Sequence, residues 1–157
     1  MNTLKSTSYD DMEIGQTATY SKTLTEEDLV LFARTSGDVN PVHLDEEFAK
    51  GTPFKTRIAH GMWSAGLISC ALGTILPGPG TVYLGQNLSF RRPVLLGDTL
   101  TVKLTVSGKQ DDKKWVTIDT DVVNQDDKLV VKGDATVMAP RSSGEIEAPD
   151  LPAVTVG

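Results

Sequence analysis

The residues best suited to chemistry in this sequence are Asp38 and His43, at the two ends of the stretch Asp-Val-Asn-Pro-Val-His. His43 is one of only two histidines among 157 residues. Histidine exchanges protons near neutral pH, and a carboxylate close by can orient its ring. Pro41 has a fixed φ and favours extended geometry at Asn40, while Gly37 gives the backbone freedom before Asp38. We therefore expect a stiffened irregular loop that holds a carboxylate and an imidazole in a set relation for proton transfer.

Helices are expected on both sides of this loop. Thr25 and Asp28 have the spacing of a capping box, which predicts a helix that runs to Ser36. After the loop, acidic residues follow Asp45 and predict a short helix that ends near Gly51.

The next segment, residues 61–73, is apolar nearly all round and rich in small residues. A helix that is hydrophobic on every side is expected to be buried. Its small side chains would let strands approach the helix axis closely. The Pro-Gly-Pro-Gly run at 77–80 ends it.

The rest of the chain changes to a period of two, which indicates strands with one dry and one wet face. Turn-rich segments separate the strands and favour an antiparallel meander. Together with one helix too apolar for water, this predicts an α+β fold in which the sheet wraps around the helix. The expected strands are residues 17–23, 81–92, 99–107, 115–123 and 129–138.

Length and composition limit the class of protein. A chain of this length favours one domain and can bury roughly 70% of its unfolded surface. The net charge of −6 argues against nucleic acid as the main partner. The longest apolar stretch, 62–76, is interrupted by Ser and Gly and is too short to span a bilayer, and no apolar leader opens the chain. We therefore expect a cytoplasmic protein that does not bind a membrane.

Three motifs carry a resemblance to a known family. Residues 38–45 fit the pattern Asp-x-Asn-Pro-x-His-x-Asp, His60-Gly61-Met62 opens the apolar helix, and Gly97-Asp98-Thr99 starts a later strand. In this order and spacing the chain resembles the MaoC-like hot-dog family, and most closely its (R)-specific enoyl-CoA hydratases. The octapeptide is the specific part, whereas His-Gly-Met alone would be weak.

The resemblance covers about residues 10–140, with a flexible N-terminus at 1–9 and a loose C-terminal tail at 141–157. It implies a hot-dog fold of about five antiparallel strands around a central helix, and homodimers formed edge to edge. It also implies a hydro-lyase that adds water reversibly to trans-2-enoyl-CoA, giving (R)-3-hydroxyacyl-CoA. The acyl-CoA thioester is the substrate, and no metal or redox cofactor takes part.

The resemblance also implies roles for individual residues. Asp38 and His43 would hold the catalytic water. The sequence leaves open which of the two protonates Cα. The first amides of a helix lack intrahelical partners and lie at its positive end, so the N–H of Gly61 would suit a thioester oxygen that becomes enolate-like. From the residues alone, an Asx turn beside a surface histidine also explains the loop.

Further substrate-binding residues are expected with less specific signals. Asn40 could hold Asp38 or the substrate, or only shape the loop. Ser69 could place a hydroxyl near the catalytic pair or the acyl pocket, with Ser64 as a second candidate. Leu72 could line an acyl tunnel, and core packing accounts for it equally well.

Two arginines and the histidines complete the candidates. Arg91 and Arg92 end a strand, where they could meet the phosphates of CoA or form a solvated charge pair. The two histidines lie seventeen residues apart without a second ligand pair, so we expect no metal site. His60 is expected to be structural and to bond the backbone near the site.

Three other functions fit the same fold. A thioesterase or an acyl-carrier-protein dehydratase would act on related thioesters, although the Asn-Pro-x-His loop argues against a thioesterase. A non-catalytic acyl-CoA-binding subunit would keep the tunnel without needing both Asp38 and His43.

Overall fold

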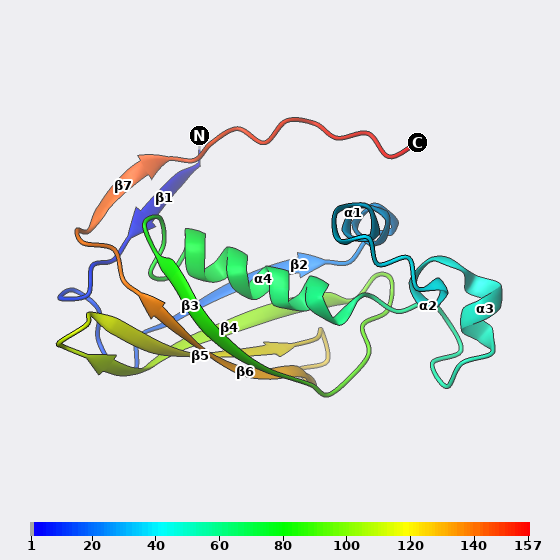
Figure 1. The fold of residues 1–157 in the computed structure, drawn as a ribbon, viewed down its shortest axis with the longest axis horizontal. Coiled ribbons are helices and arrows are strands. Elements are labelled where there is room, and N and C mark those ends of the chain that lie inside the picture. The colour runs from blue at the N-terminus through cyan, green and yellow to red at the C-terminus, as the bar shows by residue number, and fades with distance from the viewer. Residues whose placement is uncertain (1) are drawn as a thin grey trace.

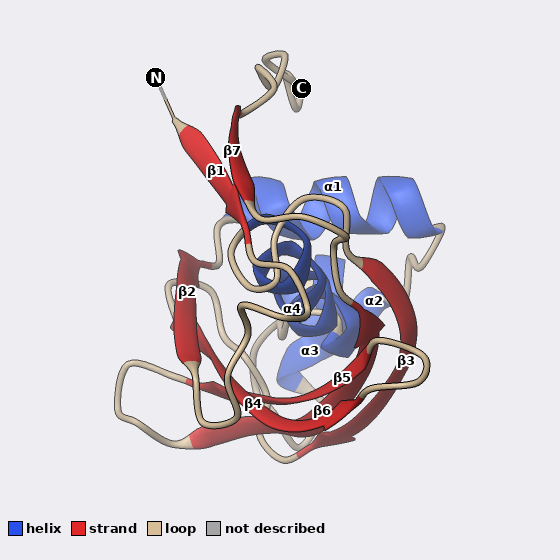
Figure 2. Ribbon diagram, turned by 90° about the vertical axis from the view of Figure 1, so that its left-hand side faces the viewer, coloured by secondary structure: helices blue, strands red, loops and turns tan. Residues whose placement is uncertain are grey.

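A curved antiparallel sheet surrounds one helix in the computed structural model, which describes residues 2–157 (Figures 1 and 2). The five strands of this sheet run in the order β2-β4-β5-β6-β3, and all neighbours are antiparallel. The elements in chain order are β1 (Thr3–Ser6), β2 (Thr17–Thr23), α1 (Glu26–Ser36), α2 (Pro41–Leu44), α3 (Glu46–Lys50), α4 (Gly61–Thr74), β3 (Val82–Phe90), β4 (Thr99–Gln110), β5 (Trp115–Val123), β6 (Leu129–Met138) and β7 (Gly144–Glu147). The predicted hot-dog arrangement is confirmed.

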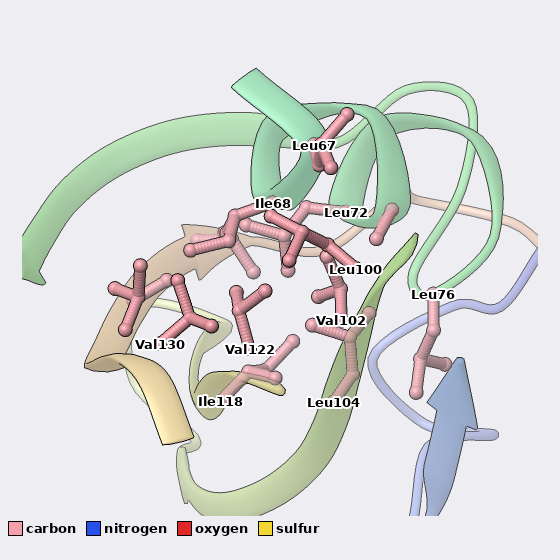
Figure 3. Close-up of a cluster of buried hydrophobic side chains, with 14 of the residues drawn as sticks. Leu67, Ile68, Leu72, Leu76, Leu100, Val102, Leu104, Ile118, Val122 and Val130 are labelled. Atoms are coloured by element: carbon pink, nitrogen blue, oxygen red, sulfur yellow. The ribbon is translucent and has the colours of Figure 1, made fainter. Parts of the chain in front are cut away.

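The core lies between the sheet and α4, where two periodicities meet. From Leu100 to Val106, every second residue of β4 turns its side chain inward and is buried. On α4, Ile68 and Leu72 are spaced by four residues and point at these strands (Figure 3). Burial of such side chains against one another fixes the helix within the sheet.

One face of α4 is not buried within the chain, which differs from the prediction of a helix covered on every side. The sheet wraps around only one side of the helix. On the open side, Gly66 and Ser69 are exposed and Met62 is 55% exposed. The small, apolar composition that predicted burial therefore leaves an uncovered apolar face in the single chain.

Three short helices gather near the N-terminal end of α4 (Figure 1). The predicted capping box forms: the Thr25 side chain accepts from the backbone of Asp28, whose carboxylate accepts from the Thr25 N–H. Gly37 ends α1 with a φ of 82°, a left-handed conformation that glycine adopts readily. The segment after it was expected to be irregular, yet Pro41 opens the one-turn helix α2, because proline is well suited to a first helical position.

The two ends of the chain differ from the expectation of a flexible N-terminus and a loose tail. Strands β1 and β7 pair with each other on the side of α4 opposite the main sheet (Figures 1 and 2). The Ser143 hydroxyl also accepts from the Ser8 N–H at 2.9 Å, which joins the tail to the N-terminal segment. These four-residue strands were missed because their pairing spans almost the whole chain. The residues after β7 form no helix or strand.

The described residues include no helix with both the length and the hydrophobicity needed to cross a bilayer.

Candidate active site

Asp38 lies immediately after the glycine that ends α1, and local hydrogen bonds set its orientation. Its N–H donates to the Ser36 hydroxyl at 3.1 Å, and its Oδ1 accepts from the Asn40 N–H at 3.1 Å. The second carboxylate oxygen, Oδ2, faces His43. One oxygen therefore holds the loop in shape while the other stays available, and the side chain is half exposed.

His43 is the third residue of α2 and is only 7% exposed. Its Nδ1 lies 2.7 Å from the carbonyl oxygen of Ile58. A carbonyl oxygen can only accept a hydrogen bond, so we assign the hydrogen to Nδ1. In the neutral ring, Nε2 then carries the lone pair.

The Nε2 of His43 and the Oδ2 of Asp38 are 4.0 Å apart. This separation is too long for a direct hydrogen bond, but one oxygen atom can lie within hydrogen-bond reach of both groups. Both atoms are acceptors in the assigned tautomer. A water molecule has two O–H groups, so a single water can donate to the imidazole and the carboxylate together, with its lone pairs free.

Gly61 begins α4 and directly follows His60, whose Nε2 lies 3.0 Å from the backbone carbonyl oxygen of Asp38. His43 and Gly61 both line a cavity of about 340 Å³. A Cβ atom at position 61 would lie 2.9 Å from the Phe90 ring, so glycine keeps the space in front of the first helical amide open. Because the first N–H groups of a helix have no intrahelical acceptor, this amide is suited to a developing negative charge.

The structure brings Asp38 close to His43, and His43 and Gly61 line one cavity, whose lining does not include Asp38. The catalytic and binding roles of these three residues stay predictions. Asn40 has a structural role: its side-chain oxygen accepts from the Val42 N–H at 3.2 Å and caps α2. Contact of Asn40 with substrate stays a prediction.

The hydroxyl that lines the cavity is that of Ser64, which the sequence placed second, and not that of Ser69. Ser69 lies on the exposed face of α4, and Leu72 packs in the core. Neither residue lines the cavity in the single chain, so their substrate roles stay predictions. Helical spacing could have placed Ser64 first, because it follows Gly61 by three residues and so lies on the same side of the helix.

Arg57 fixes the backbone that carries the Ile58 carbonyl, a contribution that sequence analysis missed. Its guanidinium donates two hydrogen bonds to Glu26 of α1, at 2.9 and 2.5 Å, and Nε lies 3.6 Å from Glu46 of α3. The hydrogen bonds from Arg57 lower the pKa of the Glu26 carboxyl, and those contacts raise the pKa of Arg57. The pair spans 31 residues in the chain, so no local spacing signals it.

Asp38, His43 and His60 place potential metal-ligand atoms within 4.8 Å of one another. The two rings stack with centroids 3.8 Å apart. His43 uses Nδ1 on a carbonyl, and His60 uses Nε2 on the carbonyl of Asp38 at 3.0 Å. The expectation that no metal binds here remains a prediction.

A family model described as a MaoC like domain matches residues 11–127. The chain belongs to this family. The matched region includes the Asp38–His43 loop, α4 and strands β2 to β5.

Named relatives match most of the chain. It is 51% identical over 132 residues to an (R)-specific enoyl-CoA hydratase of Rhodospirillum rubrum, which covers 84% of this chain and 91% of the relative. The solved structure of R-hydratase PhaJ1 from Pseudomonas aeruginosa in the unliganded form is 50% identical, with a TM-score of 0.95 over 99% of this chain and 100% of that one. An (R)-hydratase from A. caviae involved in PHA biosynthesis is 43% identical, with a TM-score of 0.80 over 82% of this chain and 98% of that one.

Proposed function

We propose that this chain is an (R)-specific 2-enoyl-CoA hydratase, a hydro-lyase that adds water reversibly to trans-2-enoyl-CoA and gives (R)-3-hydroxyacyl-CoA. The observation that carries the proposal is the 4.0 Å separation of two acceptors, His43 Nε2 and Asp38 Oδ2, with His43 lining the same cavity as Gly61, the first residue of α4. Relatives at 50% and 51% identity that are named as hydratases support the same chemistry.

In the hydration direction, the water oxygen attacks Cβ of the enoyl group and forms the new C–O bond. The electrons of the Cα–Cβ double bond move toward the thioester carbonyl, whose oxygen becomes enolate-like. The water gives up one proton to the Asp38–His43 pair, and Cα gains one proton. General acid–base assistance of this kind typically contributes about 10²–10⁴-fold to the rate.

The N–H of Gly61 stabilises the charge that develops on the thioester oxygen. This contribution depends on direct access to the amide, which the absence of a Cβ permits. The acyl chain packs against the apolar part of the cavity, where Phe90, Val94 and Val130 lie. Arg91 and Arg92 also line the cavity, and guanidinium groups suit the phosphates of CoA.

The proposal is tested by following the loss of enoyl absorbance when purified protein is mixed with crotonyl-CoA. We expect the wild type to hydrate it, and the product to be the (R) enantiomer by chiral analysis. D38N and H43A should each lower turnover by about 10²–10⁴-fold, because each removes one of the two groups that share the proton. Circular dichroism should show both variants folded.

Unchanged turnover in both folded variants would contradict the assigned mechanism. Release of free thiol from acyl-CoA, with no hydration, would instead indicate a thioesterase. Enoyl-CoA binding without any change in absorbance would indicate a non-catalytic subunit. Enoyl thioesters of increasing length in the same assay would define the acyl-chain preference.

We also propose that the protein acts as a homodimer in the cytoplasm, without a metal or redox cofactor. Strand β3 is an edge of the sheet, so one side of its backbone is free to pair. Its residues Val82, Tyr83 and Leu84 are exposed, as is Met62 on the open face of α4. A second copy along β3 would cover these apolar side chains. The description of the A. caviae relative supports a role in polyhydroxyalkanoate metabolism.

A further inference from the structure

We propose that His60 is a positioning residue for the hydration reaction, which anchors the Asp38 backbone and supports the ring of His43. The inference rests on the proposed function and names a residue that the proton transfers themselves do not require. His60 is the residue directly before Gly61 and is 2% exposed.

The first observation is a hydrogen bond between distant segments. His60 Nε2 lies 3.0 Å from the backbone carbonyl oxygen of Asp38, across 22 residues of sequence. The other two hydrogen bonds of Asp38, with Ser36 and Asn40, are local to its own loop. The bond to His60 therefore ties the loop that carries the carboxylate to the helix that carries the Gly61 amide.

The second observation is that the His60 ring contacts two other rings. Its centroid is 3.8 Å from that of His43, in a stacked arrangement, and 4.7 Å from that of Phe32 on α1. Packing against both rings restricts rotation of the His60 ring, so its Nε2 stays directed at the Asp38 carbonyl. The stacking with His60 also supports the ring of His43.

The third observation concerns which ring nitrogen carries the hydrogen in each histidine, because each ring faces a backbone carbonyl. The Asp38 carbonyl can only accept, so the hydrogen of His60 lies on Nε2. Its Nδ1 is buried and has no hydrogen-bond partner among the described residues, which is consistent with a bare lone pair there. His43 has the opposite pattern, with its hydrogen on Nδ1 toward Ile58.

These contacts matter because the site has a small tolerance for movement. Asp38 Oδ2 and His43 Nε2 must both reach one water molecule, and that water must lie over the substrate carbon. A displacement of about 1 Å in such a geometry can lower the rate by about 10²-fold. His60 fixes Asp38 through its backbone, His43 through its ring and Gly61 through the chain itself.

Nitrogen NMR tests the hydrogen pattern without any activity measurement. The chain has only two histidines, so a long-range ¹H–¹⁵N spectrum of untagged, labelled wild type at alkaline pH resolves each ring. We expect an Nε2–H tautomer for His60 and an Nδ1–H tautomer for His43, assigned by the signals that disappear in H60Q. An Nδ1–H tautomer for His60, or a mixture of the two forms, would overturn the proposal.

Kinetics of two variants test the positioning role. Gln can place an N–H donor where Nε2 lies, whereas Leu fills similar space without a donor. We expect H60L to lower kcat by about 10²-fold with a smaller change in KM, and H60Q to recover most of that loss. A matched control is F32L, which removes the other aromatic contact and keeps the hydrogen bond, and should lower kcat less than H60L does.

The outcomes separate this inference from the proposed function. An inactive wild type with the expected tautomers would contradict the hydratase and the catalytic part of this inference. An active wild type with unchanged kcat in H60L, or with H60Q as impaired as H60L, would contradict only the role of His60. If H60L does not fold, the wild-type tautomers and the kcat of H60Q decide the question.

Discussion

At the scale of single residues, Gly61 has two possible roles: its amide can take part in catalysis, or its missing side chain can only relieve crowding. A substitution at this position distinguishes them. Its missing side chain leaves room between the first amide of α4 and the ring of Phe90. Phe90 is 51% exposed, so its ring can turn aside if a methyl group is added. Access to the amide would still be reduced, because the new methyl group lies in the space that the thioester oxygen must enter.

We therefore expect G61A to fold with unchanged or slightly higher thermal stability, since alanine is favoured over glycine in helices by about 0.5–1 kcal/mol. Its turnover should fall by about 10²–10³-fold, the usual cost of losing one oxyanion donor. Thermal unfolding and crotonyl-CoA hydration measure the two effects. G73A is the matched control on the same helix, because a Cβ there meets no atom within 4 Å. A stable G61A with full turnover would show that the glycine only relieves crowding.

At the scale of elements, the ion pair of Arg57 with Glu26 joins α1 to the segment that precedes α4. The guanidinium is mostly buried, whereas the Glu26 side chain is more than half exposed, so solvent screens the interaction. The pair holds Arg57, and through the chain Ile58, whose carbonyl accepts from His43. The ion pair between Arg57 and Glu26 therefore helps to hold the Ile58 carbonyl in place, and that carbonyl keeps the hydrogen of His43 on Nδ1.

We expect E26Q to reduce the free energy of unfolding by about 0.5–1 kcal/mol at neutral pH. Because Arg57 lowers the pKa of Glu26, the stabilisation is present above the ordinary carboxyl pKa and is lost as the pH falls through the lowered value. Wild type and E26Q should therefore converge in acid. Denaturant unfolding at several pH values measures this difference in the free energy of unfolding.

E27Q is the control, since Glu27 lies in the same first turn and forms no ion pair among the described residues. An equal loss of unfolding free energy in both variants would assign the effect to the helix dipole.

At the scale of the whole molecule, both the open face of α4 and the edge strand β3 expose apolar side chains. The main sheet ends at β3, and Met62 and Ser69 of α4 are exposed on the side that this sheet does not cover. Exposed apolar patches beside a free strand edge are costly for a single chain in water. The proposed dimer removes both features at once.

Light scattering on the eluting protein should give twice the mass of one chain. L84K places a charge on the exposed edge strand and is expected to shift the protein toward the monomer. I14K is the control, because Ile14 is also exposed but precedes β2, at the opposite edge of the sheet. A monomeric wild type, or dissociation by both substitutions alike, would contradict pairing along β3.

The sequence by itself predicted the features that depend on local spacing. The period of two in β4 to β6 and the apolar run of α4 gave the sheet around a helix, because each face of an element is set by neighbours in the chain. The Asp-x-Asn-Pro-x-His motif brought Asp38 and His43 close, since proline and the Asn40 cap restrict so short a segment.

Tertiary structure decided what depends on contacts between distant residues. The bonds of His60 with Asp38 and of Arg57 with Glu26, and the pairing of β1 with β7, follow from how α4 docks into the sheet. The choice of Ser64 over Ser69 as the cavity hydroxyl depends on which side of α4 the sheet leaves open. Hydrogen bonds have a short range, so small differences in helix placement decide which donors and acceptors meet, and no residue spacing encodes that placement.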